Sequence, residues 1–254
     1  MKKEERFKQI SKDIKSVKIQ GARNIAKAAL RAYNLIPTKC SKKKLLSLRP
    51  TEPMLLNTLN NFEKIGNEKT LNHFDEAQDK INKKVFKLIK KDDVIFTHCH
   101  STNVVSALIY AKAKGKKFEV YNTETRPLYQ GRKTARALHK VGIPVTMFVD
   151  SAISVALNKE QGTKKVSKVF LGADAILKKG IINKIGSETI ARIAKQEKIP
   201  LYIIADSWKK SPKQVKLEQR SFKEIWKKSP REIKIKNPAF ELVPKKLITK
   251  IITE

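Results

Sequence analysis

The fold class is decided by the stretch Asp92-Asp93-Val94-Ile95-Phe96-Thr97-His98-Cys99-His100-Ser101. Its first half is a short run of β-branched and aromatic residues, which predicts a buried strand over residues 94–97. Its second half is polar and carries a thiol between two imidazoles. A helical stretch follows near residues 102–114. A strand that ends in polar residues and leads into a helix is the repeating unit of a parallel α/β sheet.

The same unit repeats towards the C-terminus. Strand-like runs are expected at residues 118–121, 145–149, 169–171 and 201–205, and helical stretches near residues 131–141, 151–159, 187–198 and 211–226. A late run at residues 231–235 is expected to add an edge strand. Alternating strands and helices imply a parallel sheet covered on both faces, so we predict a Rossmann-like α/β domain over residues 92–254.

The sequence before this domain shows no clear strand pattern. Apolar residues recur at helical spacing over residues 17–30, 54–65 and about 68–91. Breaks fall at Pro37, at Arg49-Pro50-Thr51-Glu52-Pro53 and at Gly66-Asn67. We therefore expect a small all-helical domain over residues 1–91 in front of the α/β domain.

Polar side chains follow each of the predicted strands. They include the His-Cys-His group, residues 124–126, Asp150, Asp174 and Asp206. In open α/β sheets ligands bind outside the carboxyl ends of the strands, so these side chains should share one rim. An aspartate at such a place is also a common helix N-cap, and we expect Asp150 and Asp206 to have that kind of supporting role.

Composition gives a lysine-rich globular protein. The chain has 254 residues, 40% of them hydrophobic, which is enough for a sizeable core, and no apolar run approaches the roughly 18 to 20 residues of a membrane span. The formal net charge is +32, but lysines outnumber arginines by 46 to 10 and are dispersed. Arginine is the better residue for bidentate phosphate and base contacts, so this favours a solvated surface over a specific nucleic-acid interface.

Cysteine usage and the first residues indicate the compartment. The start is charged and no apolar stretch follows it, which argues against a secretory signal. Cys40 and Cys99 are far apart and fit no disulfide or zinc spacing. We expect a cytoplasmic protein with reduced thiols.

Three motifs taken together resemble one superfamily. They are Thr97-His98-Cys99-His100-Ser101, then Glu124-Thr125-Arg126-Pro127-Leu128-Tyr129-Gln130-Gly131, then Gly172-Ala173-Asp174-Ala175-Ile176 with Ile182-Asn183-Lys184-Ile185-Gly186-Ser187. This superfamily contains the alpha, beta and delta subunits of translation initiation factor 2B, methylthioribose-1-phosphate isomerase and archaeal ribose-1,5-bisphosphate isomerase. The resemblance runs from about residue 18 to the C-terminus.

The motifs also favour one member of the superfamily. Its isomerases carry a cysteine at the position of Cys99 and an aspartate at that of Asp174, and the His-Cys-His form resembles the ribose-bisphosphate enzymes most. The resemblance therefore implies a cofactor-free aldose–ketose isomerase that makes ribulose 1,5-bisphosphate from ribose 1,5-bisphosphate in nucleotide salvage. Without the motifs, we would interpret Cys99 as a small buried hydrophobic residue and Asp174 as a residue that caps the following turn.

This reaction needs a base at C2 of the sugar and an acid at the ring oxygen. We expect Cys99 to be the base, with a thiolate pKa lowered by a helix N-terminus and by cationic side chains. We expect Asp174 to be the acid, with a pKa raised by desolvation.

The resemblance implies the binding residues as well. One phosphate would be held from the helical domain, by Gly21, Ala22, Arg23, Arg49, Pro50 and Thr51. Arg126 and Gln130 would face the sugar, and Asn183 with Lys184 would hold hydroxyls or phosphate. One departure concerns the phosphate, because the isomerases usually have an arginine before the glycine–alanine pair and this chain has Gln20.

Two rival functions remain, a non-enzymatic regulatory subunit like initiation factor 2B alpha and methylthioribose-1-phosphate isomerase. We expect no metal at the His-Cys-His group, because neighbours in a strand point to opposite faces. We also expect no cofactor, no specific nucleic-acid partner and no membrane. AMP is a candidate activator. A homodimer or an assembly of dimers is expected, through the α/β domain and the apolar residues of segment 237–254.

Overall fold

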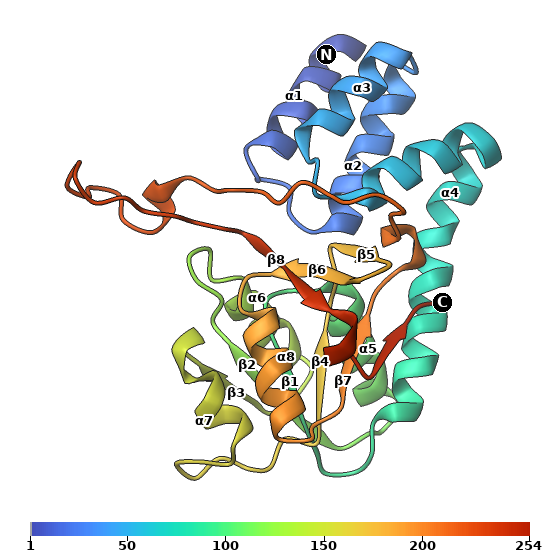
Figure 1. Ribbon diagram of the computed structural model, residues 1–254. Coiled ribbons are helices and arrows are strands. Elements are labelled where there is room, and N and C mark those ends of the chain that lie inside the picture. Colours follow the sequence, from blue (N-terminus) through green and yellow to red (C-terminus); the bar gives the residue numbers. More distant parts are fainter. Residues whose placement is uncertain (1) are drawn as a thin grey trace.

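A six-stranded sheet organises the chain after residue 92. The computed structural model describes residues 2–254, and its main sheet has the order β3-β2-β1-β4-β7-β9. These strands are β1 (Asp93–Thr97), β2 (Phe118–Thr123), β3 (Val145–Phe148), β4 (Lys168–Leu171), β7 (Leu201–Ile204) and β9 (Lys250–Ile252). Every pairing within this sheet is parallel, which confirms the Rossmann-like α/β fold (Figure 1).

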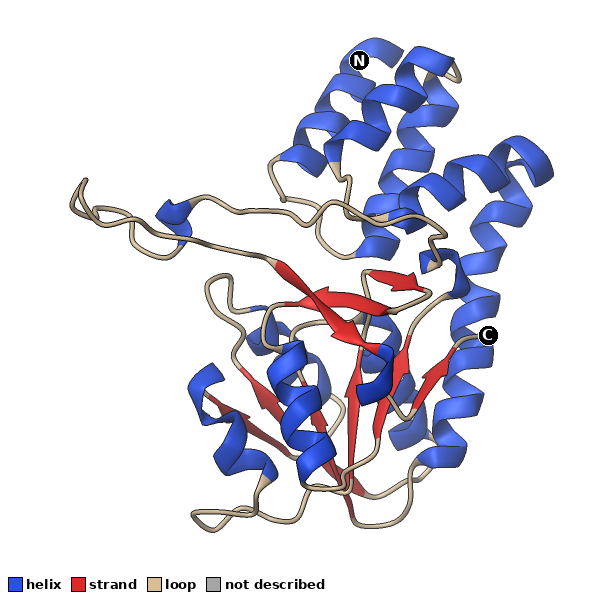
Figure 2. Ribbon diagram, in the orientation of Figure 1, coloured by secondary structure: helices blue, strands red, loops and turns tan. Residues whose placement is uncertain are grey.

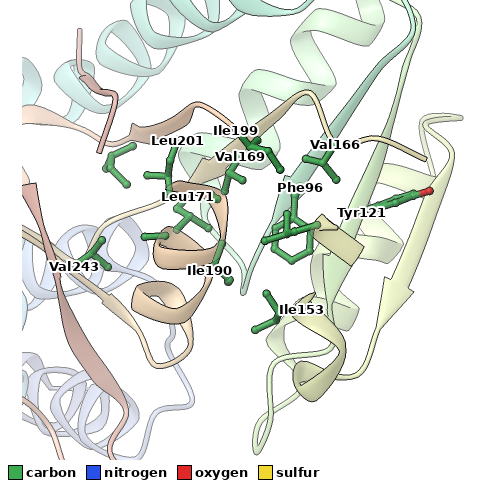
Figure 3. Close-up of a cluster of buried hydrophobic side chains, with 14 of the residues drawn as sticks. Phe96, Tyr121, Ile153, Val166, Val169, Leu171, Ile190, Ile199, Leu201 and Val243 are labelled. Carbon is green, nitrogen blue, oxygen red and sulfur yellow. The ribbon is translucent and has the colours of Figure 1, made fainter. Parts of the chain in front are cut away.

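Helices cover both faces of the sheet, as Figure 2 shows. They are α5 (Thr102–Ala113), α6 (Gln130–His139), α7 (Ile153–Leu157) and α8 (Ser187–Gln196). Successive residues of β1 point to opposite faces. Phe96 therefore packs with Ile153 of α7 and Ile190 of α8 (Figure 3), while Ile95 belongs to a second core with residues of α5 and α6.

A second, antiparallel sheet lies at the carboxyl ends of the main strands. Its order is β5-β6-β8, with β5 (Ala175–Leu177), β6 (Gly180–Lys184) and β8 (Phe240–Pro244). The sequence did not predict these strands, because their short runs carry no clear alternation. Short 3₁₀ turns complete the fold at η1 (Asp150–Ala152), η2 (Ser207–Lys209), η3 (Phe222–Glu224) and η4 (Lys245–Leu247).

The N-terminal part is helical, as expected. It consists of α1 (Lys3–Lys15), α2 (Ala22–Leu35), α3 (Lys39–Leu48) and α4 (Pro53–Leu88). Ile14, Ile25, Leu45 and Leu59 share a core of their own there. The predicted break at Gly66 is a kink inside α4, where this glycine has a φ of 79°, a backbone region that side chains disfavour. Beyond the kink, α4 packs against α5 and contributes to the sheet core.

Residues 211–237 form an extended arm rather than the expected helix over 211–226 and edge strand over 231–235. Apart from η3, the arm has no regular structure, and Figure 1 shows it leaving the body of the molecule. A helical spacing of apolar residues stabilises a helix only where a core receives them. Here these side chains stay exposed, namely Leu217, Phe222, Ile225, Trp226 and Ile233.

The prediction that segment 237–254 offers an apolar surface to a partner is also wrong. Its residues form β8 and β9, which pair with β6 and β7 of the same chain. Phe240, Val243 and Ile252 are buried in this way. The segment completes its own domain, and the exposed apolar side chains of this region lie on the arm instead. Within residues 2–254, no helix is long and apolar enough to cross a membrane.

Candidate active site

A cleft that opens to solvent lies at the carboxyl ends of the main strands, with about 980 Å³ of empty space when the open solvent at its mouth is included. Its walls come from the loop before α2, the loop before α4, the ends of β1, β4 and β6, and the base of the arm. The predicted site residues that line it are Gly21, Ala22, Arg23, Arg49, Cys99, Gln130, Asp174, Asn183 and Lys184. The fold therefore brings together both proposed catalytic residues and most of the proposed binding residues.

Cys99 stands two residues after the end of β1, in a conformation that is rare for a side-chain-bearing residue. Its φ is 64°, and Thr125 opposite it has a φ of 61°. The Cys99 N–H donates to Thr125 Oγ1 at 3.0 Å, and its carbonyl accepts from Thr134 Oγ1 at 2.7 Å. Such backbone strain persists only where the surroundings enforce it, and it is concentrated at functional sites.

The thiol does not have the lowered pKa that the sequence led us to expect. Burial raises the pKa of Cys99 to about 11, although Lys184 and the backbone N–H of His100 act in the opposite direction. Desolvation of the thiolate thus outweighs the nearby positive charge. The thiol is protonated at neutral pH in the free protein.

The two histidines beside Cys99 are held by neighbouring groups. His98 Nε2 donates to the Ile185 carbonyl at 2.9 Å, so Nδ1 accepts from Thr123 Oγ1 at 2.5 Å. Burial lowers the pKa of His98 to about 4, which keeps the ring neutral. His98 thereby ties the end of β1 to the turn that follows Lys184. The ring of His100 is bound in turn to Thr134 Oγ1 at 3.0 Å.

Asp174 lies just beyond β4, in the turn that leads into β5. Its N–H donates to the Ile182 carbonyl at 2.8 Å, which fixes it against β6. Burial raises the pKa of Asp174, against the opposing charges of Lys209, Lys184 and Arg49. This is the direction expected of a carboxyl that serves as an acid.

Gly172 brings the Asp174 turn against the Cys99 segment. A Cβ atom at Gly172 would lie 2.6 Å from both Cβ and Oγ of Ser101, the N-cap of α5. Only a glycine allows so close an approach. The glycine of the Gly172-Ala173-Asp174 motif is thus required by packing next to the site.

Three of the cations that line the cleft are predicted binding residues, and they come from different chain segments. Lys184 is buried at the end of β6, with its Nζ 4.6 Å from the centre of the Phe240 ring. Asn183 donates to Ser187 Oγ at 2.8 Å. Arg49 is buried as well, and its Nη2 lies 3.5 Å from Glu52 and 3.2 Å from Glu218. Arg23 pairs with Asp75 on α4 at 2.5 Å.

Three predicted binding residues do not line the cleft. Thr51 is buried and donates to the Lys216 carbonyl at 2.5 Å, which fastens the arm to the helical part. Pro50 is exposed. Arg126 is exposed too, with its guanidinium 5.0 Å from the centre of the Tyr129 ring.

The two other aspartates have supporting roles. Asp150 accepts from the N–H groups of Thr125 at 2.8 Å and Arg126 at 2.6 Å, and so holds the loop opposite Cys99. Asp206 caps η2 by accepting from the Trp208 N–H at 2.8 Å. It also binds His73 of α4 at 3.1 Å, which joins α4 to the end of β7.

Sequence reasoning missed several cleft residues, among them Glu52, Lys133, Lys209, Glu218 and Arg220. Glu52 stands inside the break that precedes α4, next to Arg49, and this position could have identified it. Lys209 follows the polar end of β7. Glu218 and Arg220 belong to the arm, where the expected helix gave no reason to place them at the rim.

Known proteins resemble this chain in sequence and in fold. The model of the initiation factor 2 subunit family matches residues 41–254. Ribose 1,5-bisphosphate isomerase of Archaeoglobus fulgidus is 34% identical, with 79% of this chain and 70% of the relative covered. The protein of the same name from Methanocaldococcus jannaschii is 34% identical, with 85% and 78% covered.

A solved structure resembles the chain over nearly its whole length. It is the translation initiation factor eIF-2B of Pyrococcus horikoshii, with a TM-score of 0.86, 26% identity, and 98% of this chain and 95% of that chain covered. The matched range of the family model includes the segments that hold Cys99, Asp174 and Lys184. The chain belongs to the initiation factor 2 subunit family.

Proposed function

We propose that this chain is an aldose–ketose isomerase that converts ribose 1,5-bisphosphate into ribulose 1,5-bisphosphate. The observation that carries the proposal is a thiol and a carboxyl, Cys99 and Asp174, that line one cleft together with six lysine and arginine side chains. Two curated relatives with this name, each 34% identical, support the substrate.

The reaction has two proton transfers in each half. The Cys99 thiolate takes the proton from C2 while Asp174 gives its proton to the ring oxygen, so the bond from C1 to that oxygen breaks. An enol phosphate results. Protonation of C1 by the thiol and return of the C2 hydroxyl proton to Asp174 then give the ketone and restore both groups. The acid and base each need to lie within about 3 Å of the proton they move.

The pKa directions indicate how the pair is prepared. Asp174 has a raised pKa, which favours the protonated form that an acid needs. Cys99 also has a raised pKa, so only a small fraction of the free protein holds the thiolate. Lys184 lowers the pKa of Cys99, and it is the residue best placed to stabilise the thiolate in the complex.

Phosphorus NMR of the reaction with ribose 1,5-bisphosphate tests the proposal directly. Cys99→Ser and Asp174→Asn should each lower kcat by about 10² to 10⁴-fold, since each removes one general acid or base, with substrate binding nearly unchanged. Lys184→Ala should mainly weaken substrate binding. Cys40→Ser is the matched control, because Cys40 is exposed and lies outside the cleft. Near-normal turnover by Cys99→Ser would show that another group is the base.

A regulatory subunit remains the second candidate. Gln20 lines the cleft at the position where the isomerases usually carry an arginine, and the similar Pyrococcus horikoshii protein is named a translation initiation factor. Failure of the unmutated protein to turn over the sugar bisphosphate, with and without AMP, would favour this reading.

The proposal extends to partners and compartment. AMP is the candidate activator. The cytoplasm is the proposed compartment, in keeping with the two free cysteines. We propose a homodimer or an assembly of dimers, and the exposed apolar side chains of the arm supply the contact surface. Nucleic acid should bind only without sequence preference and lose affinity at about 200 mM salt.

A further inference from the structure

We propose that Glu52 is a phosphate-binding residue of this cleft, which acts as a neutral carboxylic acid and donates a hydrogen bond beside Arg49. This deepens the proposed function, because it names a further contact for the phosphorylated substrate. The phosphate contact itself does not depend on turnover, so the two can be tested separately.

The first observation is that Glu52 is buried in the wall of the cleft. Its side chain is only 2% exposed and lines the cleft, at the residue just before Pro53 opens α4. Helices often begin with a carboxylate that caps their N–H groups, but Glu52 makes no such side-chain bond. Capping therefore does not explain why a carboxyl is buried here.

The second observation is that polar atoms of Glu52 and Arg49 lack hydrogen-bond partners among the described residues. Oε1 of Glu52 lies 3.5 Å from Arg49 Nη2, whereas its Oε2 has no hydrogen-bond partner among residues 2–254. Nε of Arg49 is also buried without a partner in the same described part of the chain. Buried polar atoms are normally paired, so an unpaired oxygen and an unpaired N–H on two neighbouring residues that both line the cleft indicate a ligand that meets both.

The charges around Glu52 decide the protonation state in which it can bind phosphate. It faces Asp174 and Glu218, which repel a second negative charge, and Arg49 and Lys209, which attract one. A phosphate dianion would be repelled by an ionised Glu52, but a protonated Glu52 carboxyl donates a hydrogen bond to it. Burial and Asp174 raise the pKa of Glu52 to about 8, so at pH 7 it is mostly neutral.

Isothermal titration with inorganic phosphate and with sulfate, between pH 7.5 and 9.0, tests the proposal. Sulfate keeps its charge over this range and so separates protein titration from ligand titration. For the unmutated protein, affinity should fall by up to about tenfold for each pH unit above 8. Proton uptake on binding, measured in buffers of different ionisation enthalpy, should rise over the same range.

Three variants complete the test. Glu52→Gln keeps a donor at every pH, so its affinity should stay flat from pH 7.5 to 9.0. Glu52→Ala loses the donor and should bind about three- to tenfold more weakly at pH 7.5. Glu160→Gln, at an exposed glutamate outside the cleft, is the matched control and should behave like the unmutated protein.

Several outcomes would overturn the proposal. They are an unchanged pH dependence in Glu52→Gln, a pH dependence lost in Asp174→Asn instead, and no binding of either anion by the unmutated protein. If the pattern holds but ribose 1,5-bisphosphate is not turned over, Glu52 remains a phosphate ligand and the isomerase assignment alone fails.

Discussion

A single methyl group at Gly172 should separate the two halves of the proposed catalytic site. In Gly172→Ala the new Cβ would lie 2.6 Å from Cβ and Oγ of Ser101. An ordinary contact between such atoms needs at least about 3.4 Å, so the two segments must move apart by about 0.8 Å. Asp174 lies two residues beyond Gly172, and Cys99 two residues before Ser101, so the movement acts on both.

The size of the effect follows from this overlap. Overpacking of a buried contact costs about 1 to 3 kcal/mol. For a protein of this length that corresponds to a fall in Tm of roughly 2 to 12 °C. A misplacement of about 1 Å at reacting groups can lower the rate by about 10²-fold. We therefore expect kcat to fall far more than the loss of stability alone would explain.

Thermal unfolding and isomerase assays should be run on a double-mutant cycle with Ser101→Gly. That second change removes both atoms that the new methyl group would strike, at a cost to the α5 cap of only a few tenths of a kcal/mol. The double variant should recover most of the Tm and most of the activity, with a coupling energy of about 1 to 2 kcal/mol. If the two losses simply add, the contact between Gly172 and Ser101 is not what fixes the site.

Further predictions concern the thiol, a buried ion pair and the arm. In a Cys40→Ser background, the rate at which iodoacetamide alkylates Cys99 should rise about tenfold per pH unit from pH 8 to 10. The reason is that the thiolate forms only as the pH approaches 11. A rate that levels off below pH 9 would contradict this. Lys168→Met leaves the Asp93 carboxylate buried without its charge partner. The free energy of unfolding, measured by urea titration, should therefore fall by about 3 kcal/mol. A loss below about 1 kcal/mol would argue that the ion pair is not essential. Light scattering should find an oligomer, and Trp226→Lys on the arm should shift it towards the 29.0 kDa monomer, whereas an unchanged mass would place the interface elsewhere.

The sequence was sufficient for the main sheet because buried parallel strands have a strong local signature. Each of the five runs expected at residues 94–97, 118–121, 145–149, 169–171 and 201–205 became a strand, whereas the late run at 231–235 did not. Cys99 and Asp174, which follow two of these strands, both line the cleft. The arm could not be predicted in the same way. Its apolar spacing is helical, but whether a helix forms depends on a surface that receives the apolar face, and only the tertiary structure supplies that.

The protonation of Cys99 was misjudged for a related reason. A helix N-terminus and nearby lysines can be inferred from the sequence, and both lower a thiol pKa. The degree of burial cannot be inferred, and desolvation acts in the opposite direction with greater effect. Glu218 shows the same limit, since it does not become part of the site until residues far apart in the chain are packed together.

The fastening of the helical part to the base of the arm has a consequence for the order of folding. Thr51 bonds to the Lys216 carbonyl 165 residues later, and Asn57 to the Trp208 carbonyl 151 residues later. Contacts at such separation form late, because much of the chain must be ordered before the loops between them can close. The parallel sheet and the helical cluster can each collapse earlier on more local contacts. Refolding should therefore pass through a compact species with native-like secondary structure that does not yet bind phosphate.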